Sequence, residues 1–199
     1  MANGKKVRDY VEPADSAAIV DYLVDFFNRP DIPELYSEEV AGTPVKEVPG
    51  KFEKEGSTGS YSRIYDIREP NVVKRKYIEL DTDKESPGYQ GHVMFKAWKD
   101  YKTEEYPWLV EKDIWHKRSP RNTLLHEAFG HGLLDALYGY NKKPHPSRTE
   151  TFPYMISALG ELLKMKREGV PENDRYYQLH LEAFEELNKM SKRTLNIGD

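Results

Sequence analysis

The segment that organises the chain reads Leu124-Leu125-His126-Glu127-Ala128-Phe129-Gly130-His131-Gly132-Leu133-Leu134-Asp135. It contains two of the six histidines, and a glutamate directly follows the first of them. Two imidazoles and a carboxylate are the groups with which a hydrolase holds a metal ion and takes a proton from the bound water. Apolar residues surround these polar ones, and buried ionisable groups need partners or a metal. We therefore expect a largely buried helix that carries a polar site.

The two histidines are five residues apart, one more than in the His-Glu-x-x-His pattern of zinc proteases. In a regular α-helix, side chains four residues apart lie about 40° from each other, and side chains five apart lie about 140° from each other. His126 and His131 can therefore share an ion only if the helix is locally distorted, as in a π-bulge. If the helix is regular, Glu127 and His131 form the working pair instead.

Gly130 and Gly132 flank His131 in the middle of this expected helix. Each costs about 1 kcal/mol of helix stability relative to alanine. Such a cost is understandable where the backbone must distort or where another element approaches closely. The glycines favour the π-bulge, although tight packing against another helix also explains them.

The segment His126-Glu127-Ala128-Phe129-Gly130-His131 resembles the His-Glu-x-x-Gly-His motif of the dipeptidyl peptidase III family. It is similar, more loosely, to the His-Glu-x-x-x-His motif of TldD-type peptidases. The resemblance implies that His126 and His131 bind zinc, that Glu127 is the catalytic base, and that a glutamate on a following helix is the third ligand. It covers about six of the 199 residues, and we do not find the second motif of dipeptidyl peptidase III, Glu-Glu-x-Arg-Ala-Glu/Asp. The chain thus looks like a zincin-type metallopeptidase outside both families.

A catalytic zinc ion with two histidine ligands needs one more protein ligand if the fourth position is kept for water. Glu150 is the first choice, because it starts the next expected helix, 19 residues after His131, and can face back across the site. The favourable field at a helix N-terminus is an alternative explanation for that carboxylate. His145 is the second choice of ligand and Glu161 is the third.

Other polar residues near the motif are candidates for supporting roles. Asp135, one turn beyond His131, is a candidate acceptor for the N–H of a ligand imidazole. Tyr154 and His145 are the leading candidates for stabilising the oxyanion, from a set of five groups close in sequence: Tyr138, Tyr140, His145, Arg148 and Tyr154. The remaining histidines show no partnering pattern and are expected to be structural or exposed: His92, His116 and His180.

The rest of the chain predicts an α+β, zincin-like fold. Apolar residues recur at helical spacing in three further segments, Ala14–Asn28, Thr149–Glu168 and Pro171–Leu195. Ser119-Pro120 suits the start of the central helix, and Gly139 its end. We expect a single domain, residues 1–199, in which a small antiparallel sheet packs with an N-terminal helix, the active-site helix and two C-terminal helices.

The expected sheet begins with a hairpin of Tyr61–Ile67 and Val72–Leu80, which are rich in β-branched and aromatic residues. Gly91–Trp98 resembles a third strand and Trp108–Trp115 a weaker fourth. Residues 29–60 have the composition of a loop, with a short strand conceivable around Val45–Val48. Residues 1–12 are expected to be frayed.

The composition excludes several classes of site and partner. Thirty lysines and arginines against 34 aspartates and glutamates give a net charge of −4, which argues against nucleic acid or an anionic membrane as the main partner. Cysteine is absent, so histidines and carboxylates must hold any metal. No apolar run approaches a membrane span, and the N-terminus lacks the apolar core of a signal peptide. We expect a cytoplasmic protein, with leaderless export as an alternative.

These patterns together predict a zinc-dependent peptidase that acts on peptide or protein substrates. Two alternatives stay open: a catalytically silent zincin-like module for binding or scaffolding, and a delivered effector or toxin protease. The motif carries no information on cleavage specificity or oligomeric state.

Overall fold

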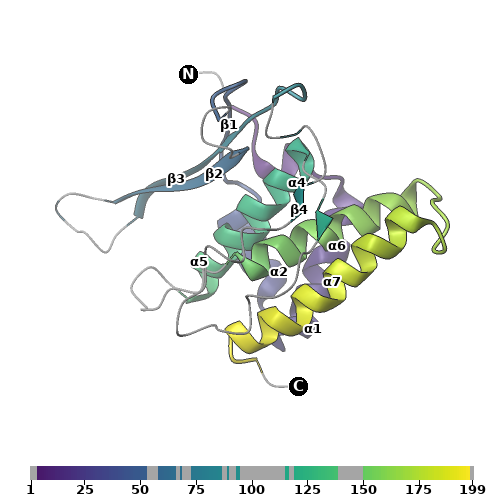
Figure 1. Ribbon diagram of the computed structural model, residues 1–199. Helices are drawn as coiled ribbons and strands as arrows, with labels where there is room; N and C mark the ends of the chain where they lie inside the picture. Colours follow the sequence, from purple (N-terminus) through teal and green to yellow (C-terminus); the bar gives the residue numbers. More distant parts are fainter. Residues whose placement is uncertain are drawn as a thin grey trace, which may run out of the picture.

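The computed structural model describes residues 4–52, 58–65, 68, 73–86, 89, 93–94, 115–116, 119–138 and 150–197. They form a mixed α+β fold in which a small sheet covers one side of a group of helices (Figure 1). The first half of the chain contains η1 (Val7–Asp9), α1 (Pro13–Phe27), α2 (Ile32–Leu35), η2 (Tyr36–Val40), β1 (Val45–Glu47), β2 (Gly59–Tyr65), β3 (Val73–Leu80) and β4 (Val93–Met94). The second half contains β5 (Trp115–His116), α4 (Pro120–Leu125), η4 (His126–Gly132), α5 (Leu133–Tyr138), α6 (Thr151–Arg167) and α7 (Arg175–Thr194).

Strand β3 is the centre of the three-stranded sheet, with β1 on one side and β2 on the other. The expected antiparallel hairpin is confirmed, with Tyr61 of β2 opposite Ile78 of β3. The expectation of a purely antiparallel sheet is wrong, because β1 pairs parallel to β3 through Val45 and Ile78. A three-residue strand with one buried side chain carries too little pattern for its direction to be read from sequence.

The expected third and fourth strands lie mostly outside the described residues. Two short pieces of them, β4 and β5, pair antiparallel with Val93 opposite His116. They form a separate two-stranded sheet instead of extending the first one.

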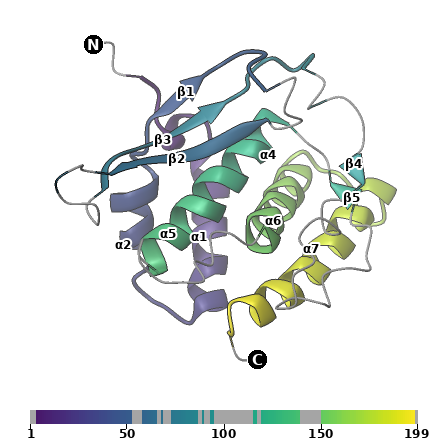
Figure 2. The same ribbon diagram turned by 60° about the vertical axis from the view of Figure 1, so that its left-hand side comes forward.

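The inner face of the main sheet rests on the central helix, as Figure 2 shows. Ile78 and Leu80 of β3 are fully buried on this face. Their antiparallel partners Tyr61 and Gly59 share the same face, because residues directly opposite each other in a sheet point to one side. Strand β2 thus runs along α4, η4 and α5, and it brings its inward residues to the segment that the sequence marks as functional.

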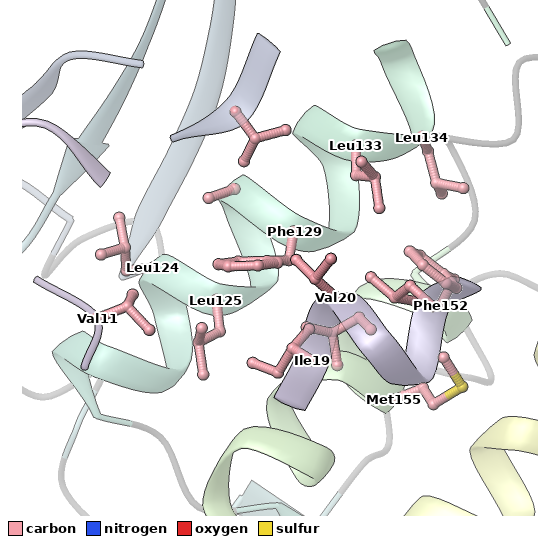
Figure 3. Packing of buried hydrophobic residues seen from close by; sticks show 14 of the residues in the cluster. Val11, Ile19, Val20, Leu124, Leu125, Phe129, Leu133, Leu134, Phe152 and Met155 are labelled. Carbon is pink, nitrogen blue, oxygen red and sulfur yellow. The ribbon is translucent and has the colours of Figure 1, made fainter. Parts of the chain in front are cut away.

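The helices enclose a continuous apolar core (Figure 3). Phe129 of the central helix packs among side chains of α1, and Phe152 and Met155 of α6 complete the cluster from the other side. Helices α1 and α6 begin and end within two residues of the bounds expected from sequence. Helix α7 starts at Arg175, four residues later than expected, because Asp174 caps it by accepting hydrogen bonds from Tyr176 N and Tyr177 N. Across the described residues, no helix combines the length and the apolarity needed to cross a membrane.

Two segments expected to lack structure are folded. Residues 29–60 contain β1 as expected, but also the one-turn helix α2 and the π-helix η2, which are too short to show periodicity. Tyr36 of η2 stacks on Phe129 with ring centroids 4.8 Å apart, so this segment supports the central helix. Residues 4–12 pack on the domain instead of fraying, since Val7 and Val11 are buried.

Candidate metal centre

The central helix is distorted where the histidine spacing requires it. Ser119 caps the helix by accepting a hydrogen bond from Asn122 N at 3.1 Å, and α4 is regular up to Leu125. From His126 to Gly132 the chain is a π-helix, and the α-helix resumes at Leu133. The wider turn brings residues five apart to one side. The ring centroids of His126 and His131 lie 5.0 Å apart, so the predicted distortion is confirmed.

The two glycines of the motif have different reasons to be there. A Cβ on Gly130 would lie 2.6 Å from both Cα and Cβ of Pro153 in α6, which leaves no room for a side chain. A Cβ on Gly132 would meet the ring of Tyr61 at 3.5 Å, an ordinary contact. Neither glycine has a positive φ. Gly130 therefore serves the close approach of α6, and the π-helix does not depend on left-handed backbone.

The close approach of α6 brings Glu150 to both histidines. Glu150 is the N-cap residue of α6, yet its side chain makes no capping hydrogen bond. One carboxylate oxygen lies 2.9 Å from His126 Nε2, and the other lies 3.5 Å from His131 Nε2. The carboxylate is thus directed at the imidazoles, as the first choice of third ligand requires.

The imidazoles determine the charge state of Glu150. Burial by itself would raise the pKa of the Glu150 carboxyl, but hydrogen bonds from His126 and His131 outweigh burial and hold that pKa well below its usual range. Glu150 is therefore a carboxylate anion that faces two nitrogen atoms.

The three side chains fit the requirements of a metal ion. Each offers one ligand atom, and these atoms all lie within 4.8 Å of one another. In a tetrahedral site with metal–ligand bonds of about 2.1 Å, ligand atoms lie roughly 3.4 Å apart. His126, His131 and Glu150 could thus hold a metal ion after small side-chain movements.

Glu127 lies on the β2 side of the central helix. A Cβ on Gly59, at the start of β2, would lie 3.5 Å from Cγ of Glu127 and 2.5 Å from Cγ2 of Thr123. The hydroxyl groups of Thr58 and Thr123 share a hydrogen bond of 2.7 Å. The hydrogen bond therefore holds the start of β2 against the central helix, one turn before Glu127. Strand β2 limits the space for the Glu127 side chain, and Glu127 is only 8% exposed.

Tyr154 lies one turn after Glu150 and packs against His126. Its ring meets the ring of His126 edge to face, with centroids 4.4 Å apart and planes at 62°. The packing restricts the orientation of the His126 imidazole. His145, the other candidate for stabilising the oxyanion, lies outside the described residues, as do Tyr140 and Arg148.

Two other carboxylates from the sequence prediction have partners outside the cluster of His126, His131 and Glu150. Asp135 is 1% exposed and forms an ion pair with Arg63 of β2 at 3.0 Å. Glu161, the third choice of ligand, accepts a hydrogen bond from Asn122 Nδ2 at 3.1 Å. It does not belong to the cluster of His126, His131 and Glu150. Of the remaining histidines, His180 is buried with Nδ1 2.8 Å from the carbonyl oxygen of Tyr176, which agrees with a structural role.

Sequence reasoning missed the residues that β2 contributes around the motif. Gly59 lies against Glu127, Tyr61 lies beside Gly132, and Arg63 pairs with Asp135. These residues come about 60 to 70 positions before the motif, and no local pattern connects them to it. Only the alternation of β2 gives a partial signal, since every second residue must face the same way.

The comparisons with known proteins give no match for this chain. No protein-family model matches the sequence, and no curated protein or solved structure matches the chain. The assignment of a function therefore rests on the geometry of the cluster itself.

Proposed function

We propose that the protein is a zinc-dependent peptidase of zincin type that hydrolyses peptide bonds in peptides or proteins. The observation that carries the proposal is the convergence of His126, His131 and Glu150. This convergence needs both a π-helix and a close approach of α6. A regular helix would separate the two histidines, and a bulkier residue at position 130 would move Glu150 away.

The chemistry of the ligands favours zinc. Two imidazoles and one carboxylate are a ligand set of catalytic zinc sites, which keep the fourth position for water. Calcium and magnesium prefer oxygen ligands throughout. When bound, zinc would lower the pKa of its water and polarise the carbonyl group of the scissile bond. His126, His131 and Glu150 would hold it.

Glu127 is the general base in this proposal. It directly follows a ligand histidine and lies on a face of the helix that β2 covers. Its carboxylate would accept the proton of the attacking water and transfer it to the leaving amine. Tyr154, which packs against His126, and His145 are the proposed donors to the oxyanion.

Metal analysis together with three variants tests the proposal. The purified protein should contain one zinc ion per chain and cleave members of a peptide library. Glu127→Gln should keep the zinc and lose roughly a hundredfold or more of the cleavage rate, as expected for loss of a general base. Glu150→Gln should lose zinc affinity. Glu168→Gln, at the exposed C-cap position of α6, is the matched control for Glu150 at the N-cap position and should change neither property.

Two results would count against the proposal. If the protein binds no zinc, and His126→Ala changes neither folding nor activity, the metal site is not there. If zinc binds at the cluster but no peptide is cleaved, the alternative of a catalytically silent binding or scaffold module is favoured instead.

A further inference from the structure

The outer face of the three-stranded sheet, turned away from the central helix, contains a shallow groove. Its volume is about 380 Å³, and six residues line it: Pro44, Val45, Lys46, Ile64, Arg75 and Tyr77. Ile64 of β2 and Arg75 of β3 lie directly opposite each other in the sheet. Their side chains point to the face opposite the one on which Ile78 is buried. All three strands contribute to the groove, so its shape is set by the sheet and not by one loop.

The groove combines an exposed apolar side chain with aromatic and aliphatic walls. Ile64 is 46% exposed, and only one other large apolar side chain among the described residues is comparably exposed, Tyr176 on α7. Isoleucine has a high propensity for β-strands, but an exposed isoleucine side chain does not gain the free energy of removing apolar surface from water. A leucine-sized side chain placed against Ile64 and Tyr77 would bury this apolar surface and gain that free energy.

The charge of the sheet is opposite to the charge of the chain. The three strands carry five cationic side chains (Lys46, Arg63, Lys74, Arg75, Lys76) and two anionic ones (Glu47, Glu79), whereas the whole chain has a net charge of −4. Arg63 pairs with Asp135 towards the central helix and Lys76 pairs with Glu39, so these two cations do not contribute to the groove. Glu47 is paired with Lys5, and the single carboxylate of Glu79 is shared by Lys46 and Lys51, so these two lysines carry one positive charge more than Glu79 balances. Arg75 is exposed and forms no ion pair with a described residue. The groove therefore offers positive charge beside an apolar surface.

We propose that this groove binds an acidic peptide segment with an apolar residue between its carboxylates, as an accessory docking site for protein substrates. The apolar side chain packs on Ile64 and Tyr77. One flanking carboxylate meets Arg75, and the other meets Lys46, whose partner Glu79 keeps its ion pair with Lys51. That the segment belongs to a substrate rests on the proposed peptidase function, whereas the binding itself does not. Nucleic acid fits less well, because phosphate binding relies on many cations and the groove presents two of them beside apolar walls.

Fluorescence anisotropy with a defined peptide tests the docking site. The probe is a fluorescein-labelled peptide in which glutamates flank a single leucine, titrated with the full chain carrying Glu127→Gln to prevent cleavage. Arg75→Glu and Ile64→Ser should each weaken binding at least tenfold. The matched controls Lys189→Glu and Tyr176→Ser, both exposed positions on α7, should leave the affinity within twofold of the parent. A probe with serine in place of leucine should bind more weakly.

The outcomes separate this proposal from the peptidase proposal. If Arg75→Glu and Ile64→Ser bind the peptide as tightly as the parent, or if an oligothymidylate of equal length binds more tightly than the peptide, the docking site is refuted. If the peptide binds and His126→Ala does not affect it, the groove stands even where zinc or cleavage is missing. With an active enzyme, Arg75→Glu should raise the KM for a substrate bearing the acidic segment and leave cleavage of a short neutral peptide unchanged.

Discussion

At the scale of single residues, the cluster of His126, His131 and Glu150 depends on a missing side chain. Gly130 lets Pro153 approach the central helix, and Pro153 lies in the first turn of α6, directly after the N-cap position that Glu150 occupies. A Cβ at 2.6 Å from backbone and ring carbons cannot be accommodated by a rotamer change, so one helix would have to move. The position of Glu150, the proposed third ligand, is thereby linked to the size of a residue that has no proposed role in metal binding.

The two motif glycines give a matched pair for testing this link. Gly130→Ala should move α6 outward and lower the zinc affinity tenfold or more, equivalent to about 1.4 kcal/mol. Gly132→Ala meets only an ordinary contact with Tyr61 and gains up to about 1 kcal/mol of helix propensity, so its zinc affinity should be unchanged. Competition titration with a zinc chelator measures both. Equal affinities in the two variants would contradict the packing argument.

Gly59 is the corresponding close approach on the β2 side. Gly59→Ala would place a methyl group 2.5 Å from Cγ2 of Thr123 and 3.1 Å from the carbonyl oxygen of Glu79, so β2 must shift away from Glu127. We expect a lower kcat at unchanged zinc content, because the base is displaced and the ligands are not. Gly42→Ala, where a Cβ meets nothing within 4 Å, is the control. Loss of zinc in Gly59→Ala would show that β2 supports the ligands instead of the base.

At the scale of elements, the π-helix η4 places the side chains of the two histidines on the same side of the central helix. Residues His126 to Gly132 form it, and it lies between two regular segments, α4 and α5, that both pack in the core. One extra residue in a wider turn leaves the flanking helices in register with their neighbours. The same wider turn places His131 beside His126. The distortion is therefore compatible with the apolar packing on each side.

Deleting Ala128 tests what zinc binding requires: only that both histidines lie on one side of the helix, or the π-helical distortion itself. The deletion produces the spacing His-Glu-x-x-His, for which a regular α-helix brings the imidazoles to one face. We expect zinc binding to persist and the thermal midpoint to be at least that of the parent, since an irregular turn is replaced by a regular one. Deleting Leu137 in α5 leaves the motif spacing intact and is the control for shortening the helix. Zinc loss on deletion of Ala128 would mean that the π-turn has a role beyond phase.

At the scale of the whole molecule, one buried carboxylate connects three helices. Asp15 of α1 pairs with Arg121 of α4 at 2.7 Å and with Arg167 of α6. Arg121 also donates from Nη1 to the carbonyl oxygen of Gly160 in α6, at 2.9 Å. These bonds hold α4 and α6 together at one part of the interface between the central helix and α6. Another part of that interface contains the cluster of His126, His131 and Glu150.

Removing the charge of Asp15 should weaken the whole assembly. In Asp15→Asn the guanidinium of Arg121, on a side chain that is 19% exposed, loses its counter-ion. We expect the free energy of unfolding to fall by about 3 kcal/mol, as for other buried ion pairs that lose one partner. Asp21→Asn, an exposed position on the same helix, should leave the denaturation midpoint unchanged. Chemical denaturation of the metal-free proteins makes the comparison, and equal midpoints would show that the network does not contribute to stability.

The sequence by itself predicted the four longer helical segments and the hairpin, and it made a local distortion of the central helix one of two alternatives. These properties follow from periodicity, capping residues and the five-residue histidine spacing, which are all local. The alternation of β2 also fixed which of its side chains share a face. The sequence made Glu150 the first choice of third ligand ahead of His145 and Glu161, but it did not settle the choice, because several polar groups follow the motif within a few turns. His145 lies outside the described residues.

Only the tertiary structure decided how the segments meet. It brought Glu150 to both imidazoles, placed Gly59 against Glu127 and paired Arg63 with Asp135. It also placed β1 parallel to β3 and folded α2 and η2 against the central helix. Such contacts join residues that are far apart in the chain. They depend on the summed packing of the core, and no short stretch of sequence contains that information.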